Sequence, residues 1–102
     1  MPFFVVELGN GPGYDPTRGR REQPLWEQHA TFMDRLVEEG FVVLGGPLGR
    51  DGESVLLVVE ADDEAAVRAR LADDPWAPLQ VLTAQRIEPW TLWLDGRGVN
   101  GV

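Results

Sequence analysis

Four short apolar runs along the chain are rich in β-branched and aromatic residues, a pattern typical of β-strands. They cover residues 3–8 (FFVVEL), 41–46 (FVVLGG), 55–60 (VLLVVE) and 79–91. Glycine-rich and proline-rich segments separate them: GNGPG stops the first run, and PLGRDGES connects the second run to the third. The pattern therefore predicts four strands, of which the second and third are joined by a turn.

A helical period replaces this pattern between the first two runs. The apolar face of the predicted helix follows an i, i+4, i+7, i+11 spacing and consists of Leu25, His29, Phe32 and Leu36. Trp26, Met33 and Val37 widen that face. Pro24 suits the first helical turn, where its missing N–H costs nothing, and Gly40 supplies a C-terminal stop. This segment is therefore predicted to be one amphipathic helix.

A second helix is predicted between the third and fourth runs. Asp62 is the expected N-cap, and the carboxylates of Asp63 and Glu64 complement the positive end of the helix dipole. Pro75 closes the helix, because the residue before a proline is pushed out of the helical region. The order of elements is then βαββαβ, which indicates an α+β, ferredoxin-like fold: an antiparallel sheet with both helices on one face.

The predicted strands are apolar on both sides, as residues 3–6, 41–44 and 55–59 show. Such runs are typical of sheets covered on both faces, whereas two helices cover only one face. The other face would be an apolar patch too large to remain in contact with water. We therefore expect a homodimer that packs sheet against sheet. The alternative is a monomer whose long loop or tail folds over that face.

Composition narrows the class of protein. A chain of 102 residues suits one domain, which we place at residues 1–94, followed by a flexible tail at residues 95–102. The formal charge of −8 argues against nucleic-acid binding, which needs clustered cations. With no cysteine and one histidine, disulfides and thiolate nucleophiles are excluded, and a tight transition-metal site within one chain is not expected.

The apolar runs also indicate where in the cell the protein is expected. None approaches the roughly 18 residues needed to span a bilayer, and the N-terminal MPFFVVELGNG has no basic region of the kind a signal peptide requires. We therefore expect a cytoplasmic protein with no membrane contact. The segment GNGPGY superficially matches a dinucleotide-binding loop, but Tyr14 takes the last glycine position and no helix follows directly, so no cofactor is expected.

His29, the single histidine of the chain, lies where the helical pattern calls for an apolar residue. An imidazole exchanges a proton near neutral pH when a partner orients its ring. Asp74, in the segment ADDPW, is the candidate partner, because it continues the inward-facing stripe of the second helix. The alternatives are a hydrogen-bonded core histidine and a solvated Asp-Pro helix stop. Two helices on one sheet face would bring the two side chains together.

Candidate ligand contacts surround this pair. In LGGPLG, Gly46 and Pro47 permit close approach of the backbone to a ligand, although a simple glycine-rich connection explains them equally well. Trp26 and Trp76 flank the proposed site. The loop TRGRR contains Arg20 and Arg21, either of which can clamp an anion with paired hydrogen bonds, the alternative being a solvated loop.

The order of these residues resembles that of the YciI-like proteins, the family of the YCII-related domain. His29 is followed by EEGFVVLGGPL, by DDPW at the end of the second helix and by IEPW on the last strand, so the resemblance spans residues 3 to 92. It implies a dimeric α+β barrel of ferredoxin-like protomers and a His/Asp site at His29 and Asp74. One departure is Trp26, since many members carry arginine there; Arg20 or Arg21 would then bind a substrate anion from the loop.

The resemblance also implies a chemistry. At least one relative is similar to a dehydrochlorinase of chlorinated hydroxyquinols, an elimination that uses proton transfer and no metal. We therefore expect a small cofactor-independent lyase or isomerase for a compact organic molecule, with His29 as general acid or base, Asp74 orienting it, and amides near Gly46 stabilising negative charge. The alternative is a non-catalytic metabolite-binding or accessory dimer. A monooxygenase sharing the barrel is a third option, without the flavin or haem contacts that such chemistry usually needs.

Overall fold

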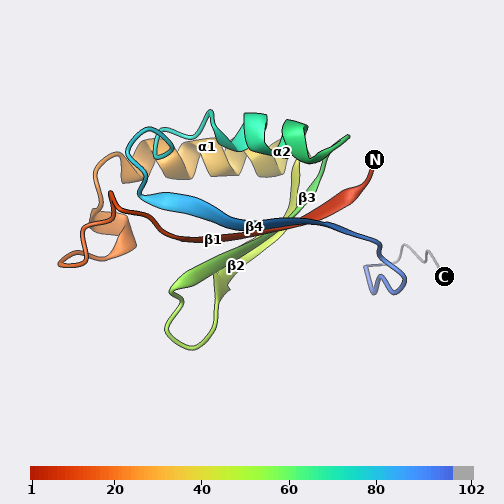
Figure 1. Cartoon of the computed structure of the whole chain (residues 1–102), viewed down its shortest axis with the longest axis horizontal. Helices are drawn as coiled ribbons and strands as arrows, with labels where there is room; N and C mark the ends of the chain where they lie inside the picture. Colours follow the sequence, from red (N-terminus) through yellow and green to blue (C-terminus); the bar gives the residue numbers. More distant parts are fainter. Residues whose placement is uncertain (98–102) are drawn as a thin grey trace.

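The computed structural model describes residues 1–97, and its elements follow the predicted βαββαβ order (Figure 1). The strands are β1 (Phe3–Asn10), β2 (Val42–Leu48), β3 (Ser54–Glu60) and β4 (Leu82–Trp90). The helices are α1 (Trp26–Glu38) and α2 (Glu64–Leu71), and a short 3₁₀ helix, η1 (Arg20–Glu22), precedes α1.

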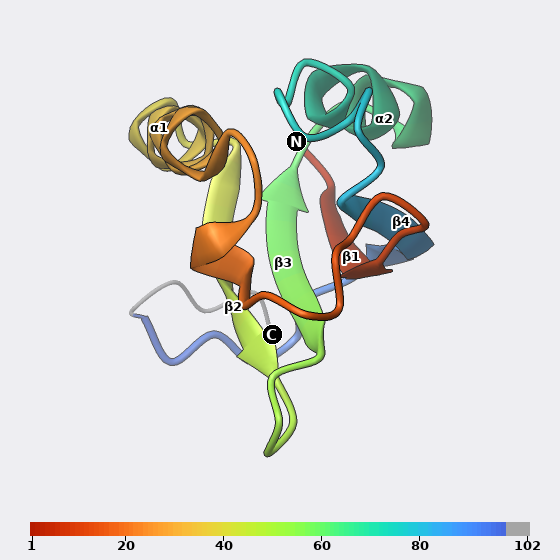
Figure 2. The same cartoon turned by 90° about the vertical axis from the view of Figure 1, so that its left-hand side faces the viewer.

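The four strands form one antiparallel sheet in the order β2-β3-β1-β4. β2 and β3 are joined by the predicted turn, and β4 returns to pair with β1 at the far edge. Both helices lie side by side over the same face of the sheet, as Figure 1 and Figure 2 show from two directions. The predicted ferredoxin-like α+β fold is confirmed.

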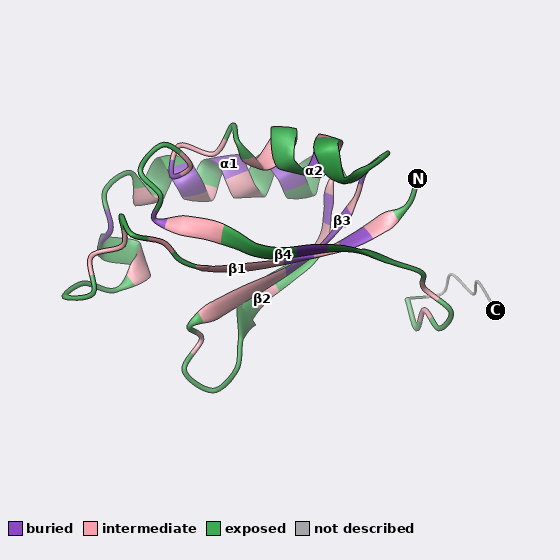
Figure 3. Cartoon of the chain, in the orientation of Figure 1, coloured by how far each residue is buried: buried purple, intermediate pink, exposed green. Residues whose placement is uncertain are grey.

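The hydrophobic core lies between the sheet and the two helices, where the buried segments meet (Figure 3). Along β1, Phe4 and Val6 point into this core, and Leu57 and Val59 do the same along β3. Helix α1 contributes Phe32 and Leu36, and α2 contributes Val67. Full burial of an aliphatic or aromatic side chain stabilises the fold by roughly 1.5–3 kcal/mol, so these few residues dominate the packing energy.

The opposite face of the sheet is not covered by any helix of residues 1–97 (Figure 2). Val5 pairs with Val58, which pairs with Leu44, and Phe3 pairs with Trp90; side chains directly opposite each other share a face. Leu44 is 57% exposed and Trp90 is 47% exposed. This face therefore carries exposed apolar side chains, as the non-alternating strands predicted, beside the charged residues Glu7, Arg86 and Glu88.

Several predicted boundaries were wrong by a few residues. Asp63, not Asp62, caps α2, since its Oδ1 accepts a hydrogen bond from the backbone N–H of Ala66 at 2.8 Å. Helix α2 ends at Leu71, well before Pro75, and Asp74 therefore lies in a turn rather than on the helix. Polar groups in this segment bond to nearby backbone atoms, which competes with continuation of the helix.

Two other local expectations also failed. Residues 79–81 are not part of β4, because Gln80 adopts a left-handed conformation (φ 54°) in a turn that its N–H closes onto the Ala77 carbonyl. Leu25 is not on the apolar face of α1: it is the N-cap, with φ 60°, and is 43% exposed. In both places the chain changes direction, and the turn geometry overrides the apolar pattern.

After β4 the chain continues into residues 91–97. There Asp95 accepts hydrogen bonds from the guanidinium and the backbone N–H of Arg97, and these bonds lower the pKa of the Asp95 carboxyl to about 2. The rest of the predicted tail, residues 98–102, lies outside the described residues. Over residues 1–97, no helix is long and apolar enough to cross a bilayer.

Candidate functional site

Helix α1 presents two adjacent stripes of side chains toward the sheet. One stripe is buried in the core and consists of His29, Phe32 and Leu36. The second stripe follows the same i, i+4, i+7, i+11 spacing, borders a cavity, and consists of Trp26, Ala30, Met33 and Val37. His29 takes part in both, because it is buried and also lines the cavity. The second stripe, which widens the apolar face of α1, therefore borders the cavity.

The cavity lies between α1 and the β2/β3 side of the sheet and has a volume of about 380 Å³. Its wall is mainly apolar, with Leu8, Val55, Leu57 and Leu82 supplied by the strands. The polar and charged side chains that reach it are Arg20, His29 and Asp34. A mainly apolar hollow with a few polar groups is the usual form of a small-molecule site.

Asp74 approaches His29 from the turn after α2. The Asp74 N–H donates to the Leu71 carbonyl at 3.1 Å, and the Ala77 N–H donates to the Asp74 carbonyl at 2.8 Å, so the backbone is held on both sides. The carboxylate also accepts a hydrogen bond from the N–H of Trp76 at 2.8 Å. This turn aims the Asp74 side chain at α1.

His29 and Asp74 are in direct contact. The Nδ1 atom of His29 lies 2.9 Å from Oδ1 and 2.8 Å from Oδ2 of Asp74, across 45 positions of sequence. Their side chains are 9% and 14% exposed. An ionised carboxylate accepts hydrogen bonds but does not donate them, so opposite an ionised Asp74 it is Nδ1 that carries a hydrogen. In the neutral form of such a ring, Nε2 presents a lone pair.

Trp76 packs against the His29–Asp74 pair and fixes the position of the imidazole ring. Its indole ring stacks on the His29 imidazole, with ring centroids 3.8 Å apart and planes inclined by 9°. The indole N–H donates to the Pro24 carbonyl at 2.6 Å, just before α1 begins. Trp76 is only 1% exposed and does not line the cavity, whereas Trp26 does. The predicted flanking role is thus split: Trp26 forms a wall, and Trp76 fixes the ring.

The remaining nitrogen of the imidazole, Nε2, makes no hydrogen bond to residues 1–97. No buried side-chain nitrogen or oxygen in that range lacks a partner, so Nε2 keeps accessible surface, and the hollow that His29 lines is the cavity described above. A ring with one nitrogen fixed by a carboxylate and the other open to a hollow is arranged to take a proton from a bound molecule and return it.

The two glycines of β2 differ in how much space a side chain would have at each position. At Gly45 a Cβ would come within 2.7 Å of Leu57 Cδ2, so the Leu57 side chain would have to move to admit a larger residue there. At Gly46 a Cβ would meet nothing within 4 Å. Gly45, Gly46 and Pro47 all line the cavity, and Pro47 belongs to β2 rather than to the connecting turn. Sequence analysis singled out Gly46 and Pro47 but missed Gly45, whose missing side chain opens the space.

Of the two loop arginines, Arg20 borders the cavity and Arg21 does not. The guanidinium of Arg21 lies over the ring of Trp26, 5.9 Å from its centroid, and Arg21 does not line the cavity. Arg20 does line it. Asp34 is a further lining residue that the sequence analysis did not identify; the available signal was its position one helical turn after Ala30 in the second stripe.

Asp74 also borders a second hollow of about 240 Å³ between α2 and β4, whose lining includes Arg68, Gln80 and Thr83. The His29–Asp74 pair therefore lies between two hollows, with His29 bordering one and Asp74 bordering the other. Over residues 1–97, no group of three or more histidine, cysteine, aspartate or glutamate side chains is arranged to hold a metal ion.

Comparisons with known proteins agree with this architecture. The family model for the YCII-related domain matches residues 7–91. The fold is similar to that of the 5-chloro-2-hydroxyhydroquinone dehydrochlorinase of Burkholderia phenoliruptrix AC1100, solved in complex with 2,5-dihydroxybenzoquinone. That likeness has a TM-score of 0.59 at 20% identity and covers 87% of this chain and 93% of the other. A search of curated proteins gave no match.

Proposed function

The chain belongs to the YCII-related domain family, and on that premise we propose that it is a small enzyme that moves one proton with His29 and Asp74. The observation that carries the proposal is the contact between Nδ1 of a buried imidazole and a carboxylate, with the other ring nitrogen open to an apolar cavity. The reaction class is a lyase or isomerase reaction on a compact organic molecule. Such chemistry moves a proton and an electron pair within the substrate and needs no cofactor.

Each step follows from the roles of the two residues. Nε2 of His29 removes a proton from the substrate, and the Asp74 carboxylate stabilises the imidazolium that forms. In an elimination, the electron pair of the broken bond forms a new double bond while a leaving group such as chloride departs with its own pair. In an isomerisation, the imidazolium returns the proton to another carbon. Backbone amides near Gly46 stabilise the negative charge that develops between these steps.

The size and lining of the cavity support a compact, ring-shaped substrate. A volume of about 380 Å³ is at the lower end of the range for small-molecule sites. Trp26 supplies a flat aromatic wall, and Gly45 and Gly46 add no side chains to the part of the wall that β2 forms. The structurally similar dehydrochlorinase was solved with a dihydroxybenzoquinone, a flat six-membered ring, which is consistent with a substrate of this shape.

The test is turnover. The first substrate to assay is 5-chloro-2-hydroxyhydroquinone, followed by chloride release, with a wider set of small cyclic acids and phenols if it is not converted. We expect His29→Asn and Asp74→Asn each to lower kcat/KM by about 10²- to 10⁴-fold, the usual contribution of a positioned acid or base. Gln28→Asn is the matched control, since Gln28 is the exposed neighbour of His29. Turnover that survives both site substitutions would contradict the proposal.

We further propose that the protein is a homodimer joined through the open face of its sheet. Val5, Val58 and Leu44 form one apolar row across that face, and Phe3 and Trp90 form another. A sheet-to-sheet contact would remove this patch from water, which is the main driving force for association. Sedimentation equilibrium of the wild type should give a dimer, and Leu44→Lys should shift the equilibrium to monomer. A wild-type monomer at micromolar concentration would overturn this part of the proposal.

A further inference from the structure

Arg20 brings a positive charge into the cavity that His29 lines. It belongs to η1, is half-buried, and borders the same hollow as His29 and Trp26. One guanidinium nitrogen, Nη2, donates a hydrogen bond to the Glu53 carbonyl at 2.7 Å. A guanidinium has five N–H donors in a fixed plane, so most of its hydrogen-bonding capacity remains for a bound molecule.

The charge of Arg20 is not neutralised within residues 1–97. No carboxylate of that range lies within ion-pair distance of it, and the arginines that do have such partners are Arg18, Arg68, Arg70, Arg86 and Arg97. Asp34 lines the same cavity without pairing with Arg20. A half-buried cation without a counter-ion is an electrostatically costly arrangement, and a bound anion relieves that cost.

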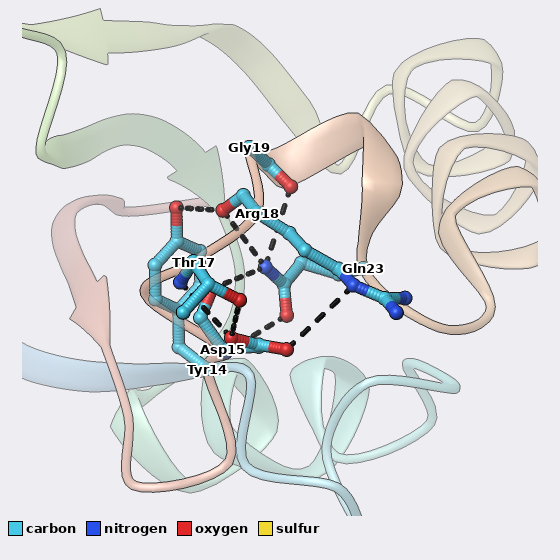
Figure 4. Close-up of polar contacts among 6 residues, drawn as sticks. All are labelled: Tyr14, Asp15, Thr17, Arg18, Gly19 and Gln23. Atoms are coloured by element: carbon cyan, nitrogen blue, oxygen red, sulfur yellow. Dashed lines mark hydrogen bonds and ion pairs between the residues drawn. The ribbon is translucent and has the colours of Figure 1, made fainter.

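Hydrogen bonds hold the Arg20 side chain on one side and the loop backbone that precedes it on the other. On one side is the Glu53 carbonyl, from the turn between β2 and β3. On the other is the buried amide of Gln23, whose Nε2 lies 3.2 Å from the Arg18 carbonyl and 3.3 Å from the Gly19 carbonyl, directly before η1. Figure 4 shows this network around Gln23. A guanidinium held in advance loses less conformational entropy when it binds a ligand.

We infer that Arg20 determines the charge class of the ligand: the cavity selects a planar singly charged anion, such as a carboxylate, phenolate or enolate, over its uncharged counterpart. The inference rests on the proposed function, because it assigns the substrate of the same site. In an acid–base reaction at His29, such an anion is either the ionised substrate or the enolate that forms when the proton leaves, and Arg20 stabilises it.

The experiment measures equilibrium binding of two unreactive probes of nearly equal shape, benzoate and benzamide, by ligand-observed NMR at low salt. We expect wild-type protein to bind benzoate at least about tenfold more tightly than benzamide, the effect of hydrogen bonds to a charged group. In Arg20→Met this preference should fall to within about twofold while the affinity for benzamide is retained, which shows that the cavity keeps its shape. Arg20→Lys should recover part of the preference.

The matched control is Arg21→Met, which removes the same charge from the adjacent residue, over Trp26 and outside the cavity lining. It should keep the preference for benzoate. The inference is overturned if wild type binds the two probes equally or binds neither, if Arg20→Met keeps the preference, or if Arg21→Met loses it. Because no turnover is needed, these results are independent of the His29→Asn and Asp74→Asn assay. Failure of the acid–base proposal and failure of anion selection are thereby distinguished.

Discussion

Gln23 and His29 are the two buried polar side chains of residues 1–97, at 3% and 7% exposure, and they use their hydrogen-bonding groups in opposite ways. Gln23 bonds within its own loop: its Oε1 accepts from the Asp15 N–H at 3.0 Å, and its Nε2 lies 2.9 Å from the Asp15 carbonyl. His29 bonds to Asp74, which is 45 positions away, and leaves its second ring nitrogen for the cavity.

The difference separates a polar group whose hydrogen bonds are all made within its own loop from one that keeps a ring nitrogen available to a ligand. The Gln23 amide is satisfied on both its oxygen and its nitrogen by backbone groups of a single loop, so it orders that loop and has nothing left for a ligand (Figure 4). The His29 ring is satisfied on one side only, and its free nitrogen is accessible from the cavity. Both residues are buried, so burial does not distinguish them. They differ in how many of their hydrogen-bonding atoms already have a partner within the protein.

Trp76 connects the two regions, and removing it is expected to have the largest effect. Its ring stacks on His29, its N–H holds Asp74, and its indole N–H bonds the Pro24 carbonyl next to Gln23. Trp76→Ala should lower the free energy of unfolding by about 3–5 kcal/mol, because it empties a fully buried site. Urea denaturation followed by circular dichroism measures the change.

Trp76→Phe is the matched control for that measurement. It keeps an aromatic ring behind His29 but removes the bond to the Pro24 carbonyl, so its cost should be smaller, about 1–3 kcal/mol. A Trp76→Ala protein as stable as the wild type would show that Trp76 does not join the two regions.

Gln23→Met tests whether the loop and the His29–Asp74 pair are separable. Methionine keeps most of the volume but leaves the Asp15 N–H without its partner, so the free energy of unfolding should fall by about 1–3 kcal/mol. The same variant should leave the His29 ring resonances unchanged in nitrogen-15 NMR, since the bond to Asp74 does not involve the loop. Gln28→Met, at an exposed position of α1, is the control and should be neutral.

If Gln23→Met shifted the His29 ring resonances as strongly as Asp74→Asn does, the two regions would be one coupled network, and the comparison drawn between them would be wrong.

The smallest effect is expected from a change of pH, which acts on stability through Asp15 in the loop that Gln23 orders. Hydrogen bonds from the Thr17 hydroxyl and then from the Thr17 N–H, with Arg18 nearby, hold the pKa of the Asp15 carboxyl below its ordinary value. Because the pKa is lowered in the folded state, the stabilisation is fully present above about pH 4 and is lost as the pH falls through the folded-state pKa. Thr17→Val should move the pKa of Asp15 back up.

A carbon-13 NMR titration of the Asp15 carboxyl in the wild type and in Thr17→Val measures this shift. An unchanged titration curve would mean that the Thr17 hydroxyl does not stabilise the Asp15 carboxylate. The His29 ring resonances should be the same in both proteins at neutral pH, because Thr17 does not contact His29 in the described structure.

Much of the fold was predictable because its signals are local. The β-branched runs of residues 3–8 and 55–60 form β1 and β3, and the i, i+4, i+7 spacing from His29 to Leu36 forms the buried face of α1. Boundaries were less predictable: Leu25 fits the helical spacing yet caps the helix, and Leu79 to Val81 fit a strand yet lie in a turn. There the direction that the chain must take between elements outweighs the pattern.

Identifying the candidate site required both the sequence and the tertiary structure. Sequence periodicity placed His29 on the inward face of α1, and the predicted side-by-side helices made Asp74 a reasonable partner. Which loop arginine reaches the cavity was not decided by sequence, because Arg20 and Arg21 are adjacent and chemically identical. The one-residue difference places one side chain on the cavity wall and the other over the Trp26 ring.

The sequence by itself determined the order of the elements, the composition of the core and the two side chains able to share a proton, because apolar periodicity and residue chemistry are properties of the chain. Only the tertiary structure decided that Nδ1 meets Asp74, that Trp76 stacks behind the ring, and that the remaining nitrogen faces a cavity with Arg20 on its wall. The contact between His29 and Asp74 joins residues 45 positions apart, and this geometry exists only once the helices have packed on the sheet.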